Sequence, residues 1–454
     1  MSAVLRLELS HGARWFLRDN GLCLRLAGNL RRHETMSEDE LEALRRAYLH
    51  RSLVAAMSRL PYYRRLAHRF PAARSVEVLQ QHFPIVTKST LIENRDRLYP
   101  RGGTARPWQS IGKTSGTTGT PLEIIRSPAS VLMESAFLRR HWAWGGYRPG
   151  MRRASLRGDM VVPLDRRRAP FWFLNRYQNQ LLISSRHLKE SCVDAIIDAI
   201  ERFSPQMLQA YPSTAFSLAQ FLERRSRRLR IPVVFTASEP LYAHQRERIA
   251  ERLGARIMDM YGMAERAAYA TECEFGSLHL NPDYSYVELV DGDGDGRPAR
   301  DVGYIVGTTF HNLAMPLVRY KLSDRTRWIR GRCRCARPFP MIEPVTGKFE
   351  DGISGSNGAF VSPSVLTFAF KGLRAIRKSQ VAQVGPGAWE VRVVPDPAFA
   401  ETDRRRIIKN IHALVDPGVD VRVVLCDEIP CTESGKFRWV VNEWSRACAE
   451  SPVT

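Results

Sequence analysis

The sequence lacks an uninterrupted apolar run of about 18 residues, so a membrane-spanning helix is not expected. Its first twenty residues carry His11, Arg14, Arg18 and Asp19 in place of the long apolar stretch of a secretory signal. Internal repeats and low-complexity tracts are also lacking, which argues against a solenoid or a fibrous array. We therefore expect a globular protein of the cytoplasm.

Cysteine is scarce, with eight residues in a chain of 454, which is too few for a disulfide scaffold. Acidic residues are outnumbered 47 to 68 by basic ones, and the formal charge of +21 favours anionic partners such as nucleotides, coenzyme A, nucleic acid or an acidic membrane surface. No basic run is interleaved with aromatic residues, so a specific nucleic-acid site is not expected. Strongly salt-dependent binding to DNA or RNA would support that alternative.

Hydrophobic periodicity divides the chain into three regions, and 454 residues exceed what one core usually holds. Residues 1 to about 85 have a helical pattern, and Ser37 followed by Glu40 predicts a capping-box start. From about 105 to 345, short apolar runs alternate with amphipathic stretches, which predicts a layered α/β fold. After about residue 350 the pattern is that of a small α+β unit, so we place a boundary near Gly347.

Individual elements follow from the same patterns. In the α/β region we expect helices over residues 192–203 and 243–253 and strands over 122–125, 207–210, 233–236 and 256–259. In the C-terminal unit we expect strands over 389–394 and 419–425 and a helix over 403–414.

The segment Lys113–Pro121 alternates small hydroxylated residues with glycines and predicts a phosphate-binding loop. Gly116 and Gly119 permit left-handed backbone conformations, so that N–H groups and hydroxyls can surround phosphate oxygens. The segment is not a Walker A loop, because Pro107 stands where that motif needs Gly. An ordinary polar turn is the alternative. The candidate phosphate-loop residues are Lys113, Thr114, Ser115, Gly116, Thr117, Thr118 and Gly119.

A second acidic and glycine-rich tract spans residues 290–300 and predicts a turn between two strands. Asp291, Asp293 and Asp295 have the spacing of a calcium loop, but Val302 stands at the closing position where such a loop needs Glu. We expect a turn here and no calcium site.

Several stretches, taken together with the phosphate loop, resemble the adenylate-forming superfamily of acyl- and aryl-CoA synthetases, and within it the branch of phenylacetate-CoA ligase and coenzyme F390 synthetase. The stretches 179–188, 210–213 and 235–241 are similar to the CapK subgroup of capsular-polysaccharide proteins in that branch. The resemblance covers residues 45 to 445. It implies an α/β fold with a large layered N-terminal adenylation domain, residues 1–346, a hinge over 347–351, and a small mobile α+β C-terminal domain, residues 352–454.

The resemblance also implies roles for residues that match the family's motifs. The segment Ser238, Glu239 and Pro240 would line the adenine, and the segment from Asp259 through Tyr261 and Gly262 to Glu265 would border adenine and hold magnesium. Asp324 would bind the ribose hydroxyls, Lys436 would be the catalytic lysine, and Glu350 would mark the hinge. Positioned donors, a lysine and Mg²⁺ suit the negative charge that builds when a carboxylate attacks the α-phosphorus of ATP.

Four residues form a candidate zinc site: Cys273 and His279 in a C-x5-H pair, and Cys333 and Cys335 in a C-x-C pair. Three thiolates and one imidazole suit a tetrahedral structural Zn²⁺ with every position filled. The spacing is unusual for a zinc finger, and reduced, unrelated cysteines are the alternative. Members of the ligase branch that this chain resembles carry a similar set.

We interpret the protein as an ATP- and Mg²⁺-dependent ligase that activates a small-molecule carboxylate and passes it to coenzyme A. Trp142, Tyr211 and Phe235 are candidate walls of the acyl pocket. One alternative keeps adenylation but acylates a saccharide, an amine or a carrier protein. Another is a non-catalytic nucleotide-binding member, since Ala264 stands where the family has Thr or Ser, and the hinge has Lys348 and Glu350 in place of Arg and Asp.

Overall fold

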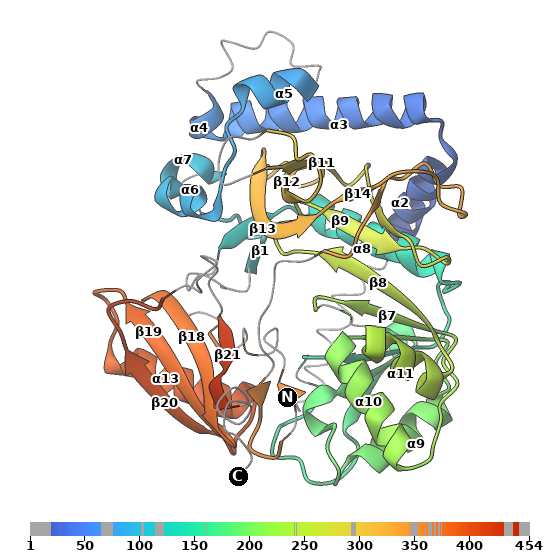
Figure 1. Ribbon diagram of the computed structural model, residues 1–454, viewed down its shortest axis with the longest axis vertical. Coiled ribbons are helices and arrows are strands. Elements are labelled where there is room, and N and C mark those ends of the chain that lie inside the picture. The colour runs from blue at the N-terminus through green and yellow to red at the C-terminus, as the bar shows by residue number, and fades with distance from the viewer. Residues whose placement is uncertain are drawn as a thin grey trace.

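The computed structural model describes most of the 454 residues (Figure 1). The described ranges are 20–64, 76–100, 104–113, 122–159, 161–239, 241, 243–291, 297–345, 353–358, 360–361, 366, 369–370, 373, 375–430 and 439–444. Within these ranges no helix is both long and apolar enough to cross a membrane.

The chain begins with helices, as the sequence predicts. They are α2 (Gly21–Arg32), the 3-10 helix η1 (His33–Thr35), α3 (Glu38–Arg59), α4 (Pro61–Arg64), α5 (Val76–His82), α6 (Lys88–Glu93) and α7 (Arg95–Leu98). The capping box is confirmed, because the Ser37 side chain accepts from the Glu40 N–H and the Glu40 carboxylate accepts from the Ser37 N–H. The buried side of α3, including Leu49 and Leu53, shares a hydrophobic cluster with Phe310.

A ten-stranded sheet forms the centre, in the order β14-β15-β10-β9-β8-β7-β6-β3-β5-β4. Its strands are β3 (Arg153–Arg157), β4 (Trp172–Asn175), β5 (Gln180–Ser184), β6 (Met207–Ala210), β7 (Val233–Ala237), β8 (Arg256–Gly262), β9 (Tyr269–Glu272), β10 (Leu278–Leu280), β14 (Trp328–Ile329) and β15 (Met341–Ile342). The five strands β5, β3, β6, β7 and β8 are parallel, and the remaining pairs are antiparallel.

Helices cover both faces of the parallel strands: α8 (Pro128–Trp144), α9 (Val193–Phe203), α10 (Pro212–Arg224) and α11 (Ala243–Leu253). Because successive strand side chains point to opposite faces, Leu208 and Val234 pack with α9, α10 and α11, whereas Met207 and Val233 pack with the end of α8. The α/β layering and the helices and strands predicted for this region are confirmed. Strand β8 runs three residues beyond the predicted 256–259, because residues 260–262 pair with β9.

Two smaller sheets lie beside the centre. The hairpin of β1 (Ser110–Lys113) and β2 (Glu123–Arg126) brackets the predicted phosphate loop. A three-stranded antiparallel sheet contains β11 (Ser285–Val290), β12 (Gly303–Thr309) and β13 (Tyr320–Thr326). The tract 290–300 therefore does connect two strands, although residues 292–296 lie outside the described part.

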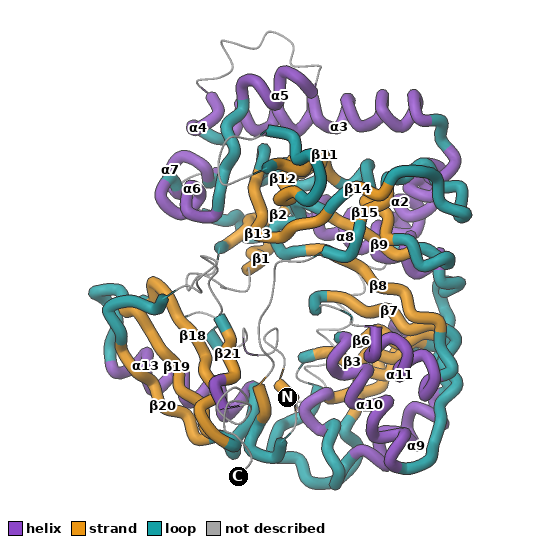
Figure 2. Tube along the Cα trace, in the orientation of Figure 1, coloured by secondary structure: helices purple, strands orange, loops and turns teal. Residues whose placement is uncertain are grey.

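The C-terminal part contains a separate four-stranded sheet in the order β20-β19-β18-β21 (Figure 2). Its elements are β18 (Ile376–Gly385), β19 (Ala388–Pro395), α13 (Glu401–Leu414), β20 (Asp420–Leu425) and β21 (Val440–Asn442), and β16 (Ile353–Ser354) pairs with β17 (Phe360–Val361) before them. The predicted strands and helix here are confirmed. The fully buried Trp389 and Trp439 belong to its core, which also includes Tyr211 from the end of β6.

A buried charge network ties η1 and α8 to the segment before β11. Both guanidinium ends of Arg140 donate to the carboxylate of Asp283, at 2.6 and 2.9 Å, and the His33 ring lies 2.6 Å from the same carboxylate. Arg140 and Asp283 are essentially inaccessible to solvent. Burial alone would raise the pKa of Asp283, but Arg140 and His33 outweigh it and hold the pKa well below its usual range.

We predict that Asp283→Asn lowers the free energy of unfolding by about 3–5 kcal/mol at pH 7, because it leaves Arg140 buried without a counter-charge. The lowered pKa means that the Asp283 carboxylate stabilises the fold above about pH 4 and loses this effect as the pH falls. The difference between wild type and variant should therefore narrow below about pH 4. Urea unfolding at several pH values measures both effects, with the exposed Asp301→Asn as the matched control. An equal loss in both variants would contradict the prediction.

Candidate active site

The carboxyl ends of the five parallel strands lie along one edge of the central sheet, which is where open α/β sheets bind ligands. The register aligns Ala210 of β6 with Thr236 of β7, and Thr236 with Asp259 of β8. The predicted adenine and magnesium segments, which follow β7 and end β8, therefore start from the same level of neighbouring strands.

Asp259 is held by hydrogen bonds with two neighbouring strands, β7 and β9, and its partner in β9 is also bound by α11. The Thr236 hydroxyl donates to its carboxylate at 2.6 Å, and the carboxylate of Glu272 accepts the Asp259 backbone N–H at 2.7 Å. Arg246 of α11 donates to the same Glu272 oxygen at 2.7 Å. Burial raises the pKa of Asp259 to about 7. These contacts fix the position of Asp259, which lies two residues before Tyr261 in β8.

Tyr261 and Asp324 meet directly, although they are 63 residues apart. The Tyr261 hydroxyl donates to the Asp324 carboxylate at 2.5 Å, and Asp324 is almost fully buried in β13. Burial, followed by the negative charge of Asp324, raises the pKa of Tyr261 well above its ordinary value. The phenol therefore stays protonated and donates to the carboxylate.

Glu265 lies near the same ring, where its charge also acts on Tyr261. Its carboxylate accepts a hydrogen bond of 3.2 Å from Tyr320, whose pKa is raised by burial and then by Glu265. Two carboxylates, Glu265 and Asp324, thus flank one tyrosine. Oxygen ligands of this kind suit Mg²⁺, and the predicted magnesium role of Glu265 stays a prediction.

The adenine segment leaves the end of β7 through Ser238, which has a left-handed backbone with φ of +74°. The Glu239 carboxylate accepts the backbone N–H of Ser213 at 3.1 Å, in the first turn of α10. This contact joins the ends of β6 and β7. Gly262, the last residue of β8, pairs with Tyr269.

Part of the predicted site lies outside the described residues: Thr114, Ser115, Gly116, Thr117, Thr118, Gly119, Pro240, Glu350 and Lys436. The backbone of Lys113 ends β1 opposite Glu123, but its side chain is not described. The roles predicted for these residues stay predictions.

The structure changes the interpretation of Trp142 and Phe235 as walls of an acyl pocket, and it adds Glu272 to the residues around the site. Trp142 and Phe235 are 3% and 2% exposed and pack together in the core beside α8, so they are not pocket walls; Tyr211 alone of the three lies at a strand end. Glu272 was missed, because a glutamate at the end of a short strand has no distinguishing sequence pattern. Its partners Arg246 and Asp259 come from elements that only the sheet brings together.

The four candidate zinc ligands do come together. Their ligand atoms all lie within 4.8 Å of one another, with 3.7 Å between Cys273 Sγ and Cys333 Sγ and 3.3 Å between Cys335 Sγ and His279 Nε2. A tetrahedral ion with bonds of about 2.3 Å to sulfur separates two thiolates by about 3.8 Å, whereas a disulfide needs about 2.05 Å. The set therefore has metal-site spacing.

The surroundings of these four residues also suit a metal. His279 Nδ1 lies 2.9 Å from the Phe339 carbonyl, which accepts its proton and leaves Nε2 as the ligand atom. Backbone N–H groups of Phe275 and Cys335 donate to the sulfurs of Cys273 and Cys333. Burial raises the pKa of the Cys333 thiol, but the Cys335 N–H and the Ser277 hydroxyl outweigh it and lower the pKa to about 6.

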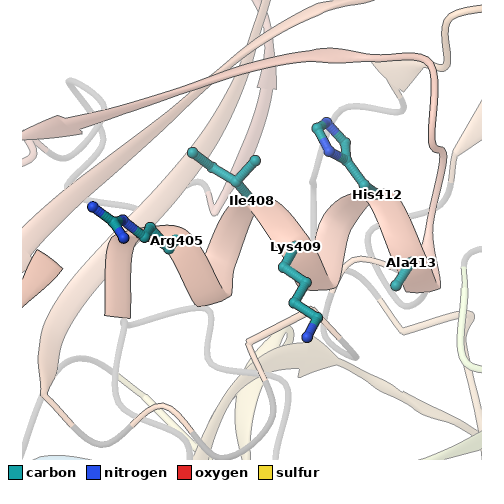
Figure 3. Close-up of a pocket in the computed structure, with 5 residues that line it drawn as sticks. All are labelled: Arg405, Ile408, Lys409, His412 and Ala413. Atoms are coloured by element: carbon teal, nitrogen blue, oxygen red, sulfur yellow. The ribbon is translucent and has the colours of Figure 1, made fainter. Parts of the chain in front are cut away.

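A shallow depression elsewhere carries none of the predicted site residues. Figure 3 shows its lining, which comes from α13 alone: Arg405, Ile408, Lys409, His412 and Ala413. It marks an outer face of the C-terminal unit.

A layered sheet followed by a small α+β unit is similar to the fold of solved CoA ligases. The structure matches that of 2-hydroxyisobutyryl-CoA ligase in complex with 2-HIB-AMP and CoA, with a TM-score of 0.59 and 19% identity over 92% of this chain and 94% of that one. Residues 353–443 match the family model of the CapK C-terminal domain.

Sequence comparison adds two relatives. Phenylacetate-coenzyme A ligase of Thermus thermophilus is 27% identical over 333 residues, covering 70% of this chain and 72% of the relative. Protein CapK of Staphylococcus aureus is 25% identical over 243 residues, covering 53% of this chain and 52% of the relative. The chain is thus a homologue of the phenylacetate-coenzyme A ligases and of CapK, and it contains a CapK C-terminal domain.

We predict that the purified protein holds about one equivalent of Zn²⁺, measured by elemental analysis, and that Cys335→Ser loses it, because a closed tetrahedral site needs all four ligands. Cys426→Ser, at a half-buried cysteine outside the cluster, is the control and should keep its metal. Equal zinc content in wild type and Cys335→Ser would contradict the assignment.

Proposed function

We propose that this protein is an AMP-forming ligase that uses ATP to activate a small-molecule carboxylate as an acyl- or aryl-adenylate and then transfers the acyl group to coenzyme A. The observation that carries the proposal is the Tyr261–Asp324 hydrogen bond, which joins two motif segments at the carboxyl edge of the sheet. Homology to phenylacetate-coenzyme A ligase supports the reaction class.

The residues divide into positioning and charge-stabilising roles. Tyr261 borders the adenine, and its hydroxyl orients Asp324, whose carboxylate accepts from the ribose hydroxyls. Ser238 and Glu239 line the adenine from β7, and Glu265 holds the magnesium ion. Lys436 and the loop from Lys113 to Gly119 neutralise the phosphoryl charge. ATP supplies the activated phosphorus, and Mg²⁺ shields the charge of its oxygens.

We further propose the division into an adenylation domain over residues 1–346, a hinge over 347–351 with its pivot at Glu350, and a lysine-carrying domain over 352–454. Apart from Tyr211, the cluster around Trp389 and Trp439 is built from residues of the C-terminal unit, which supports a unit able to move as one body. The Cys273, His279, Cys333 and Cys335 cluster would hold a structural zinc ion, tying β9 and β10 to the segment between β14 and β15. The cytoplasm, which contains ATP and coenzyme A, is the proposed compartment.

A second candidate keeps the adenylation step and changes the acceptor to a saccharide, an amine or a carrier protein. The match of residues 353–443 to the CapK C-terminal domain favours it, because that domain would face the acceptor during transfer. A non-catalytic nucleotide-binding protein is a third candidate, favoured by Ala264 at a position where the family has a hydroxyl.

The test measures pyrophosphate release from ATP and Mg²⁺ with a panel of aryl and aliphatic acids, with and without coenzyme A. We expect release that depends on one class of acid, rises with coenzyme A and falls at least about 100-fold in Lys436→Ala. Lys409→Ala, at an exposed lysine of α13, is the matched control and should match wild type.

The same assay also distinguishes coenzyme A from another acceptor, and an enzyme from a non-catalytic nucleotide-binding protein. Release that depends on an acid but not on coenzyme A would favour another acceptor. Bound ATP without release from any acid would overturn the enzymatic proposal.

A further inference from the structure

Two arginines lie at the carboxyl edge beyond the predicted nucleotide residues. Arg157 ends β3 and pairs in register with Ser184, the last residue of β5, and Arg186 follows two residues later. Leu156 of β3 is aligned with Ala210 of β6, so Tyr211 leaves the neighbouring strand at the same level. Three neighbouring strand ends therefore carry Arg157, Arg186 and Tyr211, and Tyr211 lies near both arginines.

Arg186 is held in a short 3-10 helix, η5 (Ser185–His187). The next residue, His187, is buried, stacks on Phe171 at 4.9 Å between ring centres, and lies 2.8 Å from the Ser184 hydroxyl. This anchoring fixes the backbone that presents the Arg186 side chain.

The Arg186 guanidinium is buried with little compensation. Its Nη2 reaches the Gly158 carbonyl only at 3.4 Å, and its Nε and Nη1 are inaccessible to solvent without a hydrogen-bond partner. Asp159 and Tyr211 act on it at longer range, but burial is the larger effect and lowers the pKa of Arg186 to about 10. A buried cation without an anion at hydrogen-bond distance costs the fold stability.

A second arginine and an unpartnered hydroxyl lie in the elements beside Arg186. The Arg157 guanidinium lies over the Tyr211 ring, 5.1 Å from its centre, with no ion pair within 4.0 Å among the described residues. Ser213, in the first turn of α10, has a buried hydroxyl without a partner. Two cations thus lie near Tyr211, and among the described residues neither has a carboxylate within ion-pair distance, although Asp159 acts on Arg186 at longer range and Glu239 accepts a hydrogen bond at the start of α10.

We propose that Arg157 and Arg186 form a subsite for an anionic group, a carboxylate or a phosphate, carried by a substrate of the ligase other than ATP. Arg186 supplies a guanidinium cation with two unpartnered donors, Nε and Nη1, and Arg157 supplies a second charge. The subsite rests on the proposed function for its place in a reaction. It lies two to three strands from β7, or about 10–14 Å along the edge at about 4.8 Å per strand, so it takes the far end of a substrate.

The anion has two possible carriers, the acid that is activated or coenzyme A, and kinetics distinguishes them. Pyrophosphate release and thioester formation are measured for acids with a distal carboxylate, such as glutarate and longer dicarboxylates, against their monomethyl esters, and for coenzyme A against dephospho-coenzyme A. The variants are Arg186→Gln, Arg157→Gln and the control Arg168→Gln, which removes an exposed arginine and the same charge.

We expect Arg186→Gln to raise KM at least about tenfold for the charged member of one pair only, while KM for ATP stays unchanged. A higher KM for the diacid, but not for its monomethyl ester, identifies the acid as the carrier of the anion. A higher KM for coenzyme A, but not for dephospho-coenzyme A, identifies the 3′-phosphate of coenzyme A. Equal KM values in wild type and Arg186→Gln, or equal increases for charged and uncharged members, would overturn the subsite.

Two measurements keep the inference separate from the proposed function. Calorimetry of the full chain with inorganic phosphate and with glutarate should show binding that Arg186→Gln loses and Arg168→Gln keeps, even if no acid supports turnover. Thermal melting without ligand should rise by about 2 °C in Arg186→Met, because an uncompensated buried charge is removed. A lower melting temperature together with unchanged binding would assign Arg186 a structural role and contradict the proposal.

Discussion

The parallel pairing of β5, β3, β6, β7 and β8 is the constraint on which the rest of the structure depends. Parallel strands need crossover connections. The helices α9, α10 and α11 provide those from β5 to β8 and cover one face of the sheet, whereas the connection from β3 to β5 contains β4. All five carboxyl ends consequently lie at one edge. Each strand end contributes a different chemical group there, from Tyr261 at β8 to Arg186 after β5. Fixing the register of one pair fixes the spacing of every group along the edge.

Buried polar contacts hold the strand ends at this edge in fixed positions relative to the neighbouring elements. Glu272 joins β9 to the backbone of Asp259 and to Arg246 of α11, and Arg319 joins the chain before β13 to Glu288 of β11. Such pairs contribute little net stability, since desolvation offsets their attraction, but breaking one partner is costly. They act chiefly by excluding alternative arrangements of the strands, which a site made of several strand ends requires.

Much of the fold could be predicted from the sequence, because periodicity is a local property. The adjacent apolar residues Met207 and Leu208 already indicate a strand that is buried on both faces. The spacing of Ser37 and Glu40 already indicates the capping box at the start of a helix. Pairs between distant elements are not local. The residue types of Cys273 and Cys333 indicate a metal, but their 3.7 Å separation depends on the pairing of β10 with both β9 and β15. The burial of Arg186 depends on packing that no spacing rule contains.

The contact between Glu272 and Asp259 has an evolutionary consequence. Strands β8 and β9 pair antiparallel from Met260 with Thr271 to Gly262 with Tyr269, so the faces of Tyr261 and Glu272 depend on this register. A shift of this register by one residue would reverse the direction of every side chain of β9 and remove the contact of Glu272 with Asp259. Descendants of this sequence can thus change the connection between 262 and 269 only in ways that keep this register, and Glu265 within it is further constrained by its hydrogen bond with Tyr320.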